Sequence, residues 1–279
     1  MQGELLNCIE KWPGRLECNL DLADLYPSRH EFVEFKNRYN EFLSSDKETR
    51  AMYRLKGKRL IYQSEQVIPS KRDRRPALLL IFGNPASHSV KAGCFFAFKD
   101  GKENPFWKSL LSVAGILDFG HEGEIEDAEA NRRRLKRMLT ADYRSPFRLG
   151  LCVFVSMPSR AGGDWSGVAG IRRLLGKKAW DRVNELETDR VFNIAKKFVK
   201  GDGVVVTFQR DAWEGLRSKN DSPYAVTKAR EGRLKGSLNG WEVIRLMGTP
   251  PTRLLGPSRE VLRQMLSQEG FELLPNSDH

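Results

Sequence analysis

The residues best suited to chemistry closely follow one apolar run. The run, residues 77–82, is predicted to be a buried strand, and Gly83-Asn84-Pro85 ends it in a turn. In open α/β sheets, ligands and chemistry gather where strands end. The Asn84 amide oxygen can accept a hydrogen bond from water without removing its proton, and His88 can donate to a leaving group or a phosphate. A turn Asn that caps its own backbone and an exposed loop His are the simpler alternatives.

An aromatic cluster and a helix start come next along the chain. The cluster contains Phe95, Phe96 and Phe98, and the sequence NPFW at 104–107 then opens a predicted helix over residues 105–114. The apolar positions of that helix share one face. Three clustered rings cannot all face one pocket, so Phe95 and Phe98 are expected in the core.

This order of parts resembles the first motif of the uracil-DNA glycosylase superfamily, and most closely its thymine/uracil mismatch branch. There a strand ends in Gly-x-Asn-Pro, a Gly-x-x-Phe element follows, and Asn-x-Phe-Trp begins the next helix. The matching residues in this sequence are Asn84, Pro85, Gly93, Phe96, Asn104, Phe106 and Trp107. One departure is that Gly83 directly precedes Asn84, whereas the glycine of the family lies one residue earlier.

The resemblance implies roles for the residues that match. Asn84 would orient the hydrolytic water, and Phe96 would stack on a base flipped out of the DNA. Gly83 and Pro85 would line the base pocket beside them. An amide is a weak base, so modest rates are expected on an oxocarbenium-like path.

The end of the second predicted strand supplies further candidates for the base pocket. In the mismatch branch an Asn often occupies this place and reads the base edge, whereas here Ser156 and Met157 stand there. One hydroxyl cannot make the paired contacts of an amide. The smaller side chain of Ser156 predicts room for a base larger than uracil. Arg160 follows as a candidate DNA contact.

The end of the fourth predicted strand resembles the second motif of the family only in part. That motif reads His-Pro-Ser or Asn-Pro-Ser, and the sequence TPP at 249–251 occupies its place. Thr249 therefore stands where a His or Asn stabilises the departing base. Arg253 and Leu254 in the following loop are predicted to fill the gap left by the flipped nucleotide. A proline-rich strand exit is the alternative.

Strand and helix patterns alternate after residue 76. The predicted strands are 77–82, 149–156, 203–208 and 242–247, and the predicted helices are 105–114, 127–139, 180–200, 212–216 and 258–269. The alternation predicts a three-layer α/β/α sandwich around a central four-stranded parallel sheet, which is also the fold of the glycosylase superfamily. The Gly-rich stretch 162–170 is predicted to be a flexible loop over the cleft, with Trp165 as a candidate DNA-facing aromatic.

Residues 1–75 are predicted to be a mostly helical, basic extension that packs on the catalytic domain of residues 76–279. The stretch is short for an independent core. A helix over residues 31–43 is expected from its apolar spacing.

The charge of the chain favours a polyanionic partner. The formal net charge is +11 and the pI about 9.6. Two basic clusters have few acids nearby and are the better candidates for phosphate contacts, residues 71–75 and the long polar segment 217–240. That segment is predicted to be a loop or hairpin, and its Arg230, Arg233 and Lys235 are the candidate DNA contacts.

The sequence also disfavours several other kinds of protein. No stretch approaches the ~20 consecutive apolar residues of a membrane helix, and no secretory signal is visible, so a cytoplasmic location is expected. The cysteines at 8, 18, 94 and 152 lack C-x-x-C spacing and are expected to be buried free thiols rather than metal ligands. Carboxylates do not cluster at the predicted strand ends, which argues against a metal nuclease. Neither a metal nor an organic cofactor is expected.

These patterns and the resemblance together predict a monofunctional DNA glycosylase. It would act on DNA as a monomer, excise a damaged, mismatched or modified pyrimidine, and leave an abasic site for other enzymes to process. The superfamily extends to enzymes that remove bulky modified cytosines from phage DNA, which makes anti-phage defence one expected role. The alternative is a catalytically weak or inactive nucleic-acid-binding module on the same fold, which the altered second motif favours and Asn84 disfavours.

Overall fold

A five-stranded sheet forms the centre of the structure, a computed structural model that describes residues 5–71, 73–120, 125–201, 203–250 and 257–275. The strand order is β6-β5-β7-β9-β8, and every pair is parallel except β8 with β9. The bounds are β5 (Ala77–Phe82), β6 (Arg148–Val153), β7 (Val204–Thr207), β8 (Lys235–Leu238) and β9 (Trp241–Gly248). The four predicted parallel strands are therefore confirmed, and β8 adds an antiparallel edge from the segment left open as loop or hairpin.

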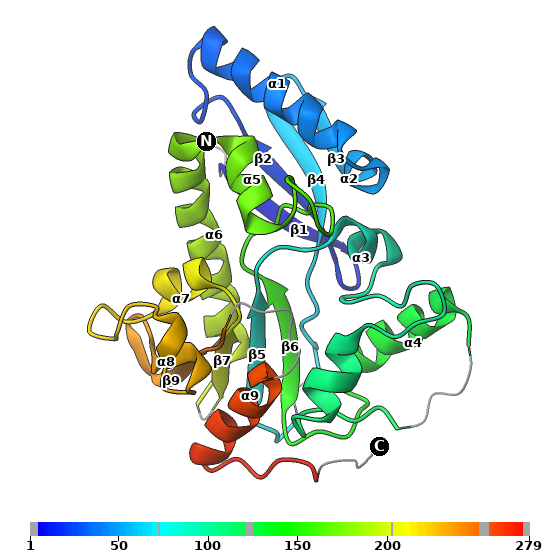
Figure 1. The fold of residues 1–279 in the computed structure, drawn as a ribbon, viewed down its shortest axis with the longest axis vertical. Helices are drawn as coiled ribbons and strands as arrows, with labels where there is room; N and C mark the ends of the chain where they lie inside the picture. Colours follow the sequence, from blue (N-terminus) through cyan, green and yellow to red (C-terminus); the bar gives the residue numbers. More distant parts are fainter. Residues whose placement is uncertain (1–4, 72, 121–124, 202, 251–256, 276–279) are drawn as a thin grey trace.

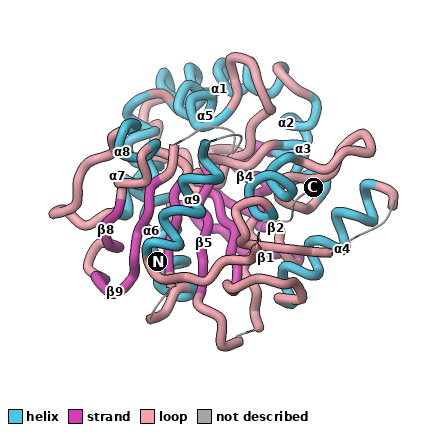
Figure 2. Tube along the Cα trace, turned by 60° about the horizontal axis from the view of Figure 1, so that its bottom comes forward, coloured by secondary structure: helices cyan, strands magenta, loops and turns pink. Residues whose placement is uncertain are grey.

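Helices cover both faces of this sheet because its strands are apolar on both sides. Leu79 and Ile81 of β5 face one core, and Leu78 and Leu80 face the other. The first core contains residues of α5 (Gly167–Leu175), α6 (Lys177–Phe198) and α7 (Arg210–Leu216). The second contains residues of the π-helix η1 (Phe106–Ser112), α4 (Asp127–Thr140) and α9 (Pro257–Gln268). Figure 2 shows α9 lying across the strands. The protein is thus an α/β structure with three layers.

Two short helices, α3 and α8, were not predicted from the sequence. α3 (Ser87–Ala92) begins just after the Asn84 turn, and α8 (Val226–Arg230) lies within the segment before β8. The Gly-rich stretch 162–170 was expected to be loop throughout, but α5 begins at Gly167. Trp165 is only 8% exposed and packs edge-on against Phe42. It is therefore a core residue rather than a DNA-facing one.

The amino-terminal region is not mostly helical, which corrects the prediction from sequence. It contains a four-stranded antiparallel sheet of order β1-β2-β4-β3, with helices α1 and α2 beside it. The bounds are β1 (Leu6–Trp12), β2 (Arg15–Asp21), α1 (Arg29–Ser44), α2 (Lys47–Met52), β3 (Tyr53–Lys56) and β4 (Arg59–Glu65). In β2 buried and part-exposed residues alternate strictly, the period of a strand with one covered face. We call this region, residues 5–65, the antiparallel unit.

The predicted helix over residues 31–43 is confirmed as α1. Ser28 and Glu31 form a capping box at its start, in which each side chain accepts from the backbone of the other. The buried face of the helix consists of Phe35, Tyr39 and Phe42.

The antiparallel unit packs on the rest of the protein, as we expected from the sequence. The Tyr26 hydroxyl donates to Leu175 O at 2.6 Å, and Arg38 Nε donates to Leu174 O at 2.9 Å. Beyond β4, Val67 exchanges two backbone hydrogen bonds of 2.8 Å with Leu151 of β6. Apolar residues of both regions form one continuous core. Figure 1 shows the antiparallel strands above the carboxyl ends of β5 and β6.

Two of the four cysteines are not free, which corrects another expectation. Cys8 and Cys18 stand directly opposite each other on β1 and β2 and form a disulfide. Their partnership depends on strand register, which spacing in the sequence does not reveal. Cys152 is a buried free thiol, as predicted, and Cys94 is also buried.

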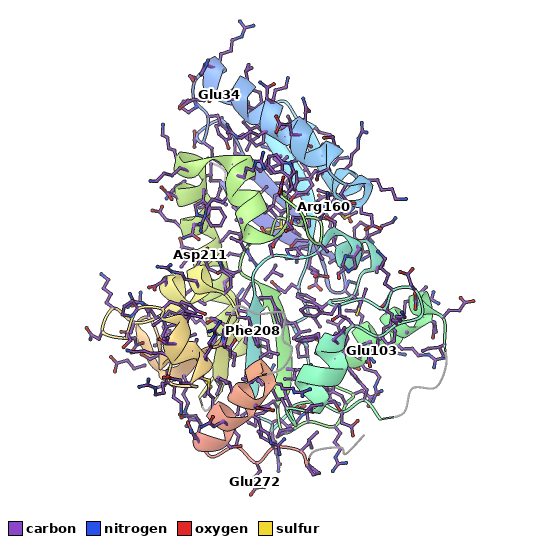
Figure 3. All side chains as sticks on the ribbon, in the orientation of Figure 1. Glu34, Glu103, Arg160, Phe208, Asp211 and Glu272 are labelled. Atoms are coloured by element: carbon purple, nitrogen blue, oxygen red, sulfur yellow. A yellow bond between two sulfur atoms is a disulfide. The ribbon has the colours of Figure 1, made fainter. Side chains whose placement is uncertain are left out.

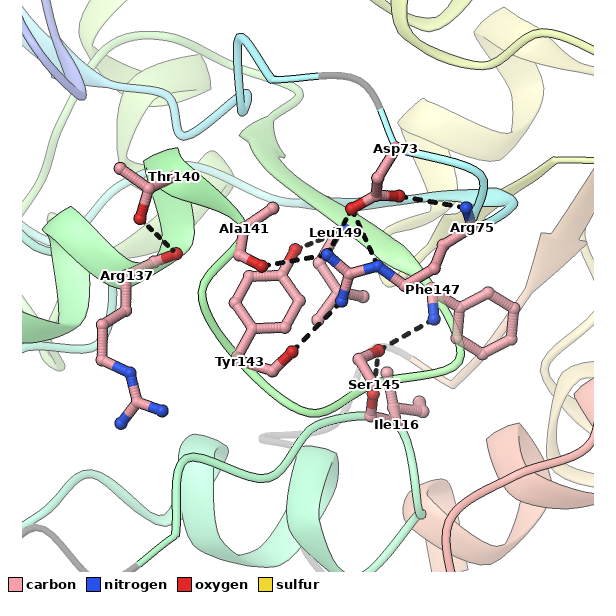
Figure 4. A network of polar contacts seen from close by, with 10 residues as sticks. All are labelled: Asp73, Arg75, Ile116, Arg137, Thr140, Ala141, Tyr143, Ser145, Phe147 and Leu149. Carbon is pink, nitrogen blue, oxygen red and sulfur yellow. Dashed lines mark hydrogen bonds and ion pairs between the residues drawn. The ribbon is translucent and has the colours of Figure 1, made fainter.

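Arg75, from the basic cluster at residues 71–75, contributes to folding at the end of the sheet opposite the Asn84 turn (Figure 4). Arg75 pairs with Asp73 and donates to the backbone oxygens of Ala141 and Tyr143. Its guanidinium also lies 4.9 Å from the centre of the Tyr143 ring. Arg75 therefore holds the segment before β5 against the loop before β6, which argues against its role as a phosphate contact.

No helix within the described ranges is long and apolar enough to cross a membrane.

Candidate active site

Asn84 lies where the order of the parallel strands reverses. The chain leaves β5 for β6 on one side and then crosses to β7 on the other. In doubly wound sheets the crevice at this switch point, beside the carboxyl ends of the strands, is the usual ligand site. Gly83 and Asn84 follow β5, and Gln209 follows β7 nearby, with its Cγ within 3.6 Å of an ideal Gly83 Cβ. The predicted position of Asn84 at a strand's carboxyl end is therefore confirmed.

The Asn84 side chain is held by its nitrogen. Nδ2 donates to Met157 O at 3.1 Å and to Ser159 Oγ at 3.0 Å. Because a backbone carbonyl only accepts, the contact with Met157 determines which end of the amide is nitrogen. No described protein group donates to Oδ1, and Asn84 lines a cavity. The arrangement presents an amide oxygen that can accept a hydrogen bond from a water or a ligand.

This cavity has a volume of about 510 Å³ and is open to solvent. Its lining consists of Asn84, Pro85, Ala86, Ser159, Arg160, Ala161, Gly162, Ser166 and Gly167. These residues come from the turn after β5, the segment after β6 and the start of α5. We call it the Asn84 cavity. A larger groove of about 1200 Å³ lies between β1 and α6, but none of the predicted site residues lines it.

The start of α5 and Arg160 make the Asn84 cavity electrostatically positive. Gly167 has φ +65°, a backbone conformation that favours glycine, and its N–H donates to Ser159 Oγ at 2.8 Å. Ser166 and Gly167 at the start of α5 line the cavity, so the positive end of the α5 dipole is directed at it, and the Ser166 side chain does not cap the helix. Arg160 Nη1 donates to Ser45 O at 2.9 Å, and Figure 3 shows this residue where the antiparallel unit meets the parallel sheet. Such a site favours a ligand with negative charge.

His88 lies close along the chain but does not line the Asn84 cavity. It is half-buried in α3. Burial and the nearby Lys99 lower the pKa of His88, while Glu48 and Asp46 oppose that shift. The imidazole is therefore neutral at neutral pH and does not add positive charge to the site.

Ser156 does not line the cavity, which argues against its predicted contact with a base. Its side chain is 0% exposed. The hydroxyl donates to Glu187 Oε1 at 2.5 Å and contacts the Tyr62 hydroxyl at 2.8 Å. A hydroxyl committed to two interior partners cannot read a base edge. The small size of Ser156 therefore gives no reason to expect room for a base larger than uracil.

Met157 is also fully buried, so its side chain is a core residue. Its backbone oxygen nevertheless serves the site, because it accepts from Asn84 Nδ2. Pro85 is buried and lines the cavity together with Asn84, as expected for a pocket residue. Gly83 lies beneath it, with Val168 3.3 Å from an ideal Gly83 Cβ, so that α5 packs closely on the turn.

Thr249 has an internal structural role. Its side chain is 0% exposed, and its backbone N–H and hydroxyl both bond to Thr207 O, at 2.9 Å and 3.2 Å. These bonds extend the pairing of β9 with β7, and Thr249 is not among the residues that line the Asn84 cavity. The stabilisation of a departing base that was predicted for this position is therefore not supported. Arg253 and Leu254 lie outside the described residues.

Phe96 belongs to an aromatic cluster beside the Asn84 turn. One ring face stacks on Phe106 with 3.9 Å between centroids, and the ring meets Phe82 edge-on. Phe96 has φ +49°, an uncommon conformation for a large side chain, and Trp107 Nε1 donates to its backbone oxygen at 3.0 Å. The ring is half-buried and does not line the Asn84 cavity. Its predicted stacking on a base stays a prediction.

The phenylalanines on either side of Phe96 differ in burial. Phe95 is buried in the second core, as predicted. Phe98 is only half-buried and lies under the Arg134 guanidinium, 4.6 Å from its ring centre. Phe82 and Phe208 stack face to face at the carboxyl ends of β5 and β7.

Two of the three predicted DNA contacts in the 217–240 segment already pair with other residues of the protein. Lys235 donates to Gln268, the last residue of α9, at 3.0 Å and to Glu269 just after it at 2.9 Å, which anchors β8. Arg233 pairs with Glu231. Arg230 is exposed at the end of α8 and makes no ion pair within the described chain. Arg230 is therefore the better candidate for a phosphate contact.

Sequence reasoning missed several residues that build the Asn84 cavity. Ser159 joins Asn84 to the start of α5, and Ser166 and Gly167 shape the far wall. A signal for α5 was present, because Ser166 precedes apolar residues at helical spacing, as an N-cap residue does. The stretch was instead interpreted from its glycines.

No group of three or more His, Cys, Asp or Glu within the described chain could hold a metal ion. No protein-family model matches this sequence, and no curated protein matches it at a significant level.

Proposed function

We propose that this protein is a DNA glycosylase that hydrolyses the bond between a pyrimidine-derived base and deoxyribose. The observation that carries the proposal is the Asn84 amide at the switch point of the sheet, which is held by its nitrogen while no group in the described part of the chain donates to its oxygen. This is the geometry needed to orient a water without deprotonating it. The resemblance of residues 78–116 to the first glycosylase motif supplies the reaction.

In the proposed reaction the nucleotide first leaves the base stack. The bond between the base nitrogen and C1′ breaks, and the base keeps the electron pair. The water held by Asn84 then adds its oxygen to C1′, and its released proton neutralises the base. Arg160 and the start of α5 offer positive potential for the phosphate backbone or for the charge that develops on the base. An abasic site remains.

The proposed substrates are damaged, mismatched or modified pyrimidines, including the bulky cytosines of phage DNA. With Ser156 in the interior, no described side chain has an evident base-reading role. Net charge +11 supports DNA as the partner.

A second candidate is a nucleic-acid-binding module without catalysis on the same fold. The observation that favours it is that Ser156 and Thr249, two positions aligned with base-contacting residues of the family, are both committed to internal hydrogen bonds. Binding would then use the positive Asn84 cavity and the exposed cations alone.

A substrate panel separates the two candidates. Oligonucleotides with uracil, mismatched thymine or modified cytosines, together with phage DNAs, are incubated with the protein, and abasic sites are detected. Asn84→Ala should lose base release and keep DNA affinity, because the amide orients water rather than holding DNA. Asn239→Ala, in an exposed turn, is the matched control and should behave as the parent. Binding without base release from any substrate of the parent would favour the second candidate.

A further inference from the structure

Two tyrosines of the antiparallel unit reach the segment that follows β6. The Tyr53 hydroxyl of β3 donates to Pro158 O at 2.6 Å. The Tyr62 hydroxyl of β4 lies 2.8 Å from Ser156 Oγ. Both phenols are buried, with Tyr53 7% and Tyr62 1% exposed. Their two partners flank Met157, the residue whose carbonyl accepts from Asn84 Nδ2.

The direction of these hydrogen bonds follows from the number of protons. Ser156 donates its only hydroxyl proton to Glu187 Oε1, so Tyr62 must be the donor to Ser156. Burial raises the pKa of both Tyr53 and Tyr62 far above their ordinary value, which keeps their protons in place. Glu187 of α6 also accepts the Ser156 backbone N–H at 2.6 Å. Hydrogen bonds from the antiparallel unit and from α6 therefore both hold the segment that follows β6.

The same segment is joined to the Asn84 turn by backbone hydrogen bonds. Val155 donates to Gly83 O at 2.8 Å, Ser159 donates to Pro85 O at 3.1 Å, and Ser87 donates to Ser159 O at 2.9 Å. These bonds place Met157 O and Ser159 Oγ under the Asn84 amide. A third link from the unit lies alongside, where Thr49 Oγ1 contacts Ser87 Oγ at 2.7 Å.

We propose that Tyr53 and Tyr62 are positioning residues for Asn84, so that the antiparallel unit is a working part of the site rather than an appendage. Their hydroxyls hold the backbone of residues 156–158, and the Met157 carbonyl in turn orients the Asn84 amide. The catalytic consequence rests on the proposed function, whereas the orientation of the amide does not.

The test compares two double variants that each remove two buried phenol hydroxyls. Tyr53→Phe/Tyr62→Phe removes both links to residues 156–158. Tyr26→Phe/Tyr39→Phe is the matched control, because these tyrosines belong to the same aromatic cluster and Tyr26 donates to Leu175 O, away from the Asn84 turn. The protein is labelled with ¹⁵N-asparagine, and the side-chain amide signal of Asn84 is assigned by its loss in Asn84→Ala.

The Asn84 amide signal should shift or broaden in Tyr53→Phe/Tyr62→Phe and stay in place in the control, with both variants folded by near-UV circular dichroism. On a substrate that the parent cleaves, kcat should fall roughly 10-fold to 100-fold in the first variant with KM nearly unchanged. The control should keep the parent kcat. If the first double variant does not fold, the single Tyr53→Phe variant is measured in the same way.

An Asn84 signal that stays in place in the folded Tyr53→Phe/Tyr62→Phe variant, or that moves equally in the control, would overturn the positioning role. Failure of the proposed function looks different. In that case the parent releases no base from any substrate, and the amide signal alone still decides whether the tyrosines orient Asn84.

Discussion

The Asn84 side chain donates a hydrogen bond to the Ser159 hydroxyl at the carboxyl edge of the sheet. Ser159 Oγ accepts from Asn84 Nδ2 at 3.0 Å and from the Gly167 N–H at 2.8 Å. One hydroxyl therefore ties the turn after β5 to the start of α5. This contact and the Met157 carbonyl leave the amide only one orientation that satisfies both.

Asn84→Asp should lower the rate of base release about 100-fold at neutral pH. The carboxylate has no donor for Met157 O, so the side chain would turn away from that carbonyl, and its oxygens would no longer hold the water in the orientation that the amide sets. Partial recovery below the pKa of the new carboxyl is expected, because a protonated Asp can donate to Met157 O again. Single-turnover rates across pH measure the effect, and Asn239→Asp controls for the added charge. A rate equal to that of the parent at neutral pH would show that the amide orientation is irrelevant.

Ser156→Asn should destabilise the protein by about 1–3 kcal/mol and should not redirect base preference. The position is 0% exposed between Glu187 and Tyr62, and a larger amide does not fit there. Urea unfolding gives the free energy of unfolding. The control is Ser44→Asn at the exposed end of α1, expected within about 0.5 kcal/mol of the parent. A stable Ser156→Asn variant that prefers uracil would instead restore a base-reading role to this position.

Arg230→Ala should flatten the salt dependence of DNA binding by about 0.9 in log–log slope, the value for one phosphate contact. Lys235→Ala should leave the slope unchanged, because the Lys235 ammonium is held by Gln268 and Glu269. Fluorescence anisotropy with a labelled duplex at several salt concentrations gives both slopes. Equal slopes for Arg230→Ala and the parent would place α8 away from the DNA.

Glu65 should make the protein less stable as pH rises. Burial raises the pKa of Glu65 from its ordinary 4.5 to about 8, against a smaller opposing effect of Arg15. The folded state thus keeps a proton that the unfolded state loses above pH 4.5. The stabilisation is complete below the unfolded pKa and declines by about 1.4 kcal/mol per pH unit until the folded pKa is passed.

Urea unfolding at pH 5 and pH 8 measures this decline. Glu65→Gln stays neutral throughout and should show a smaller difference between the two pH values. Glu17→Gln, a neighbouring carboxyl on β2 that is half-exposed and paired with Lys11, is the control and should follow the parent. An identical pH dependence in Glu65→Gln would mean that Glu65 titrates normally.

Much of the parallel sheet could be predicted from sequence because its signals are local. Unbroken apolar runs such as Ala77–Phe82 and Val204–Thr207 indicate strands buried on both faces, and helices between them imply parallel order. The turn that carries Asn84 was found for the same reason, since a glycine, an amide and a proline end the run. The antiparallel unit was missed although polar and apolar residues alternate in Arg15–Asp21, the pattern of a strand with one covered face, because the region was interpreted from its polar composition.

The sequence by itself determined where Asn84 stands in the chain and which kinds of side chain follow each strand. Only the tertiary structure decided which of those side chains face a cavity. Ser156 and Thr249 stand at strand ends in the sequence, yet Ser156 meets Tyr62 across 94 residues and Thr249 meets Thr207 across 42. The physical reason is that a buried polar group must find a hydrogen-bond partner, and that partner can come from any part of the chain that folding brings near.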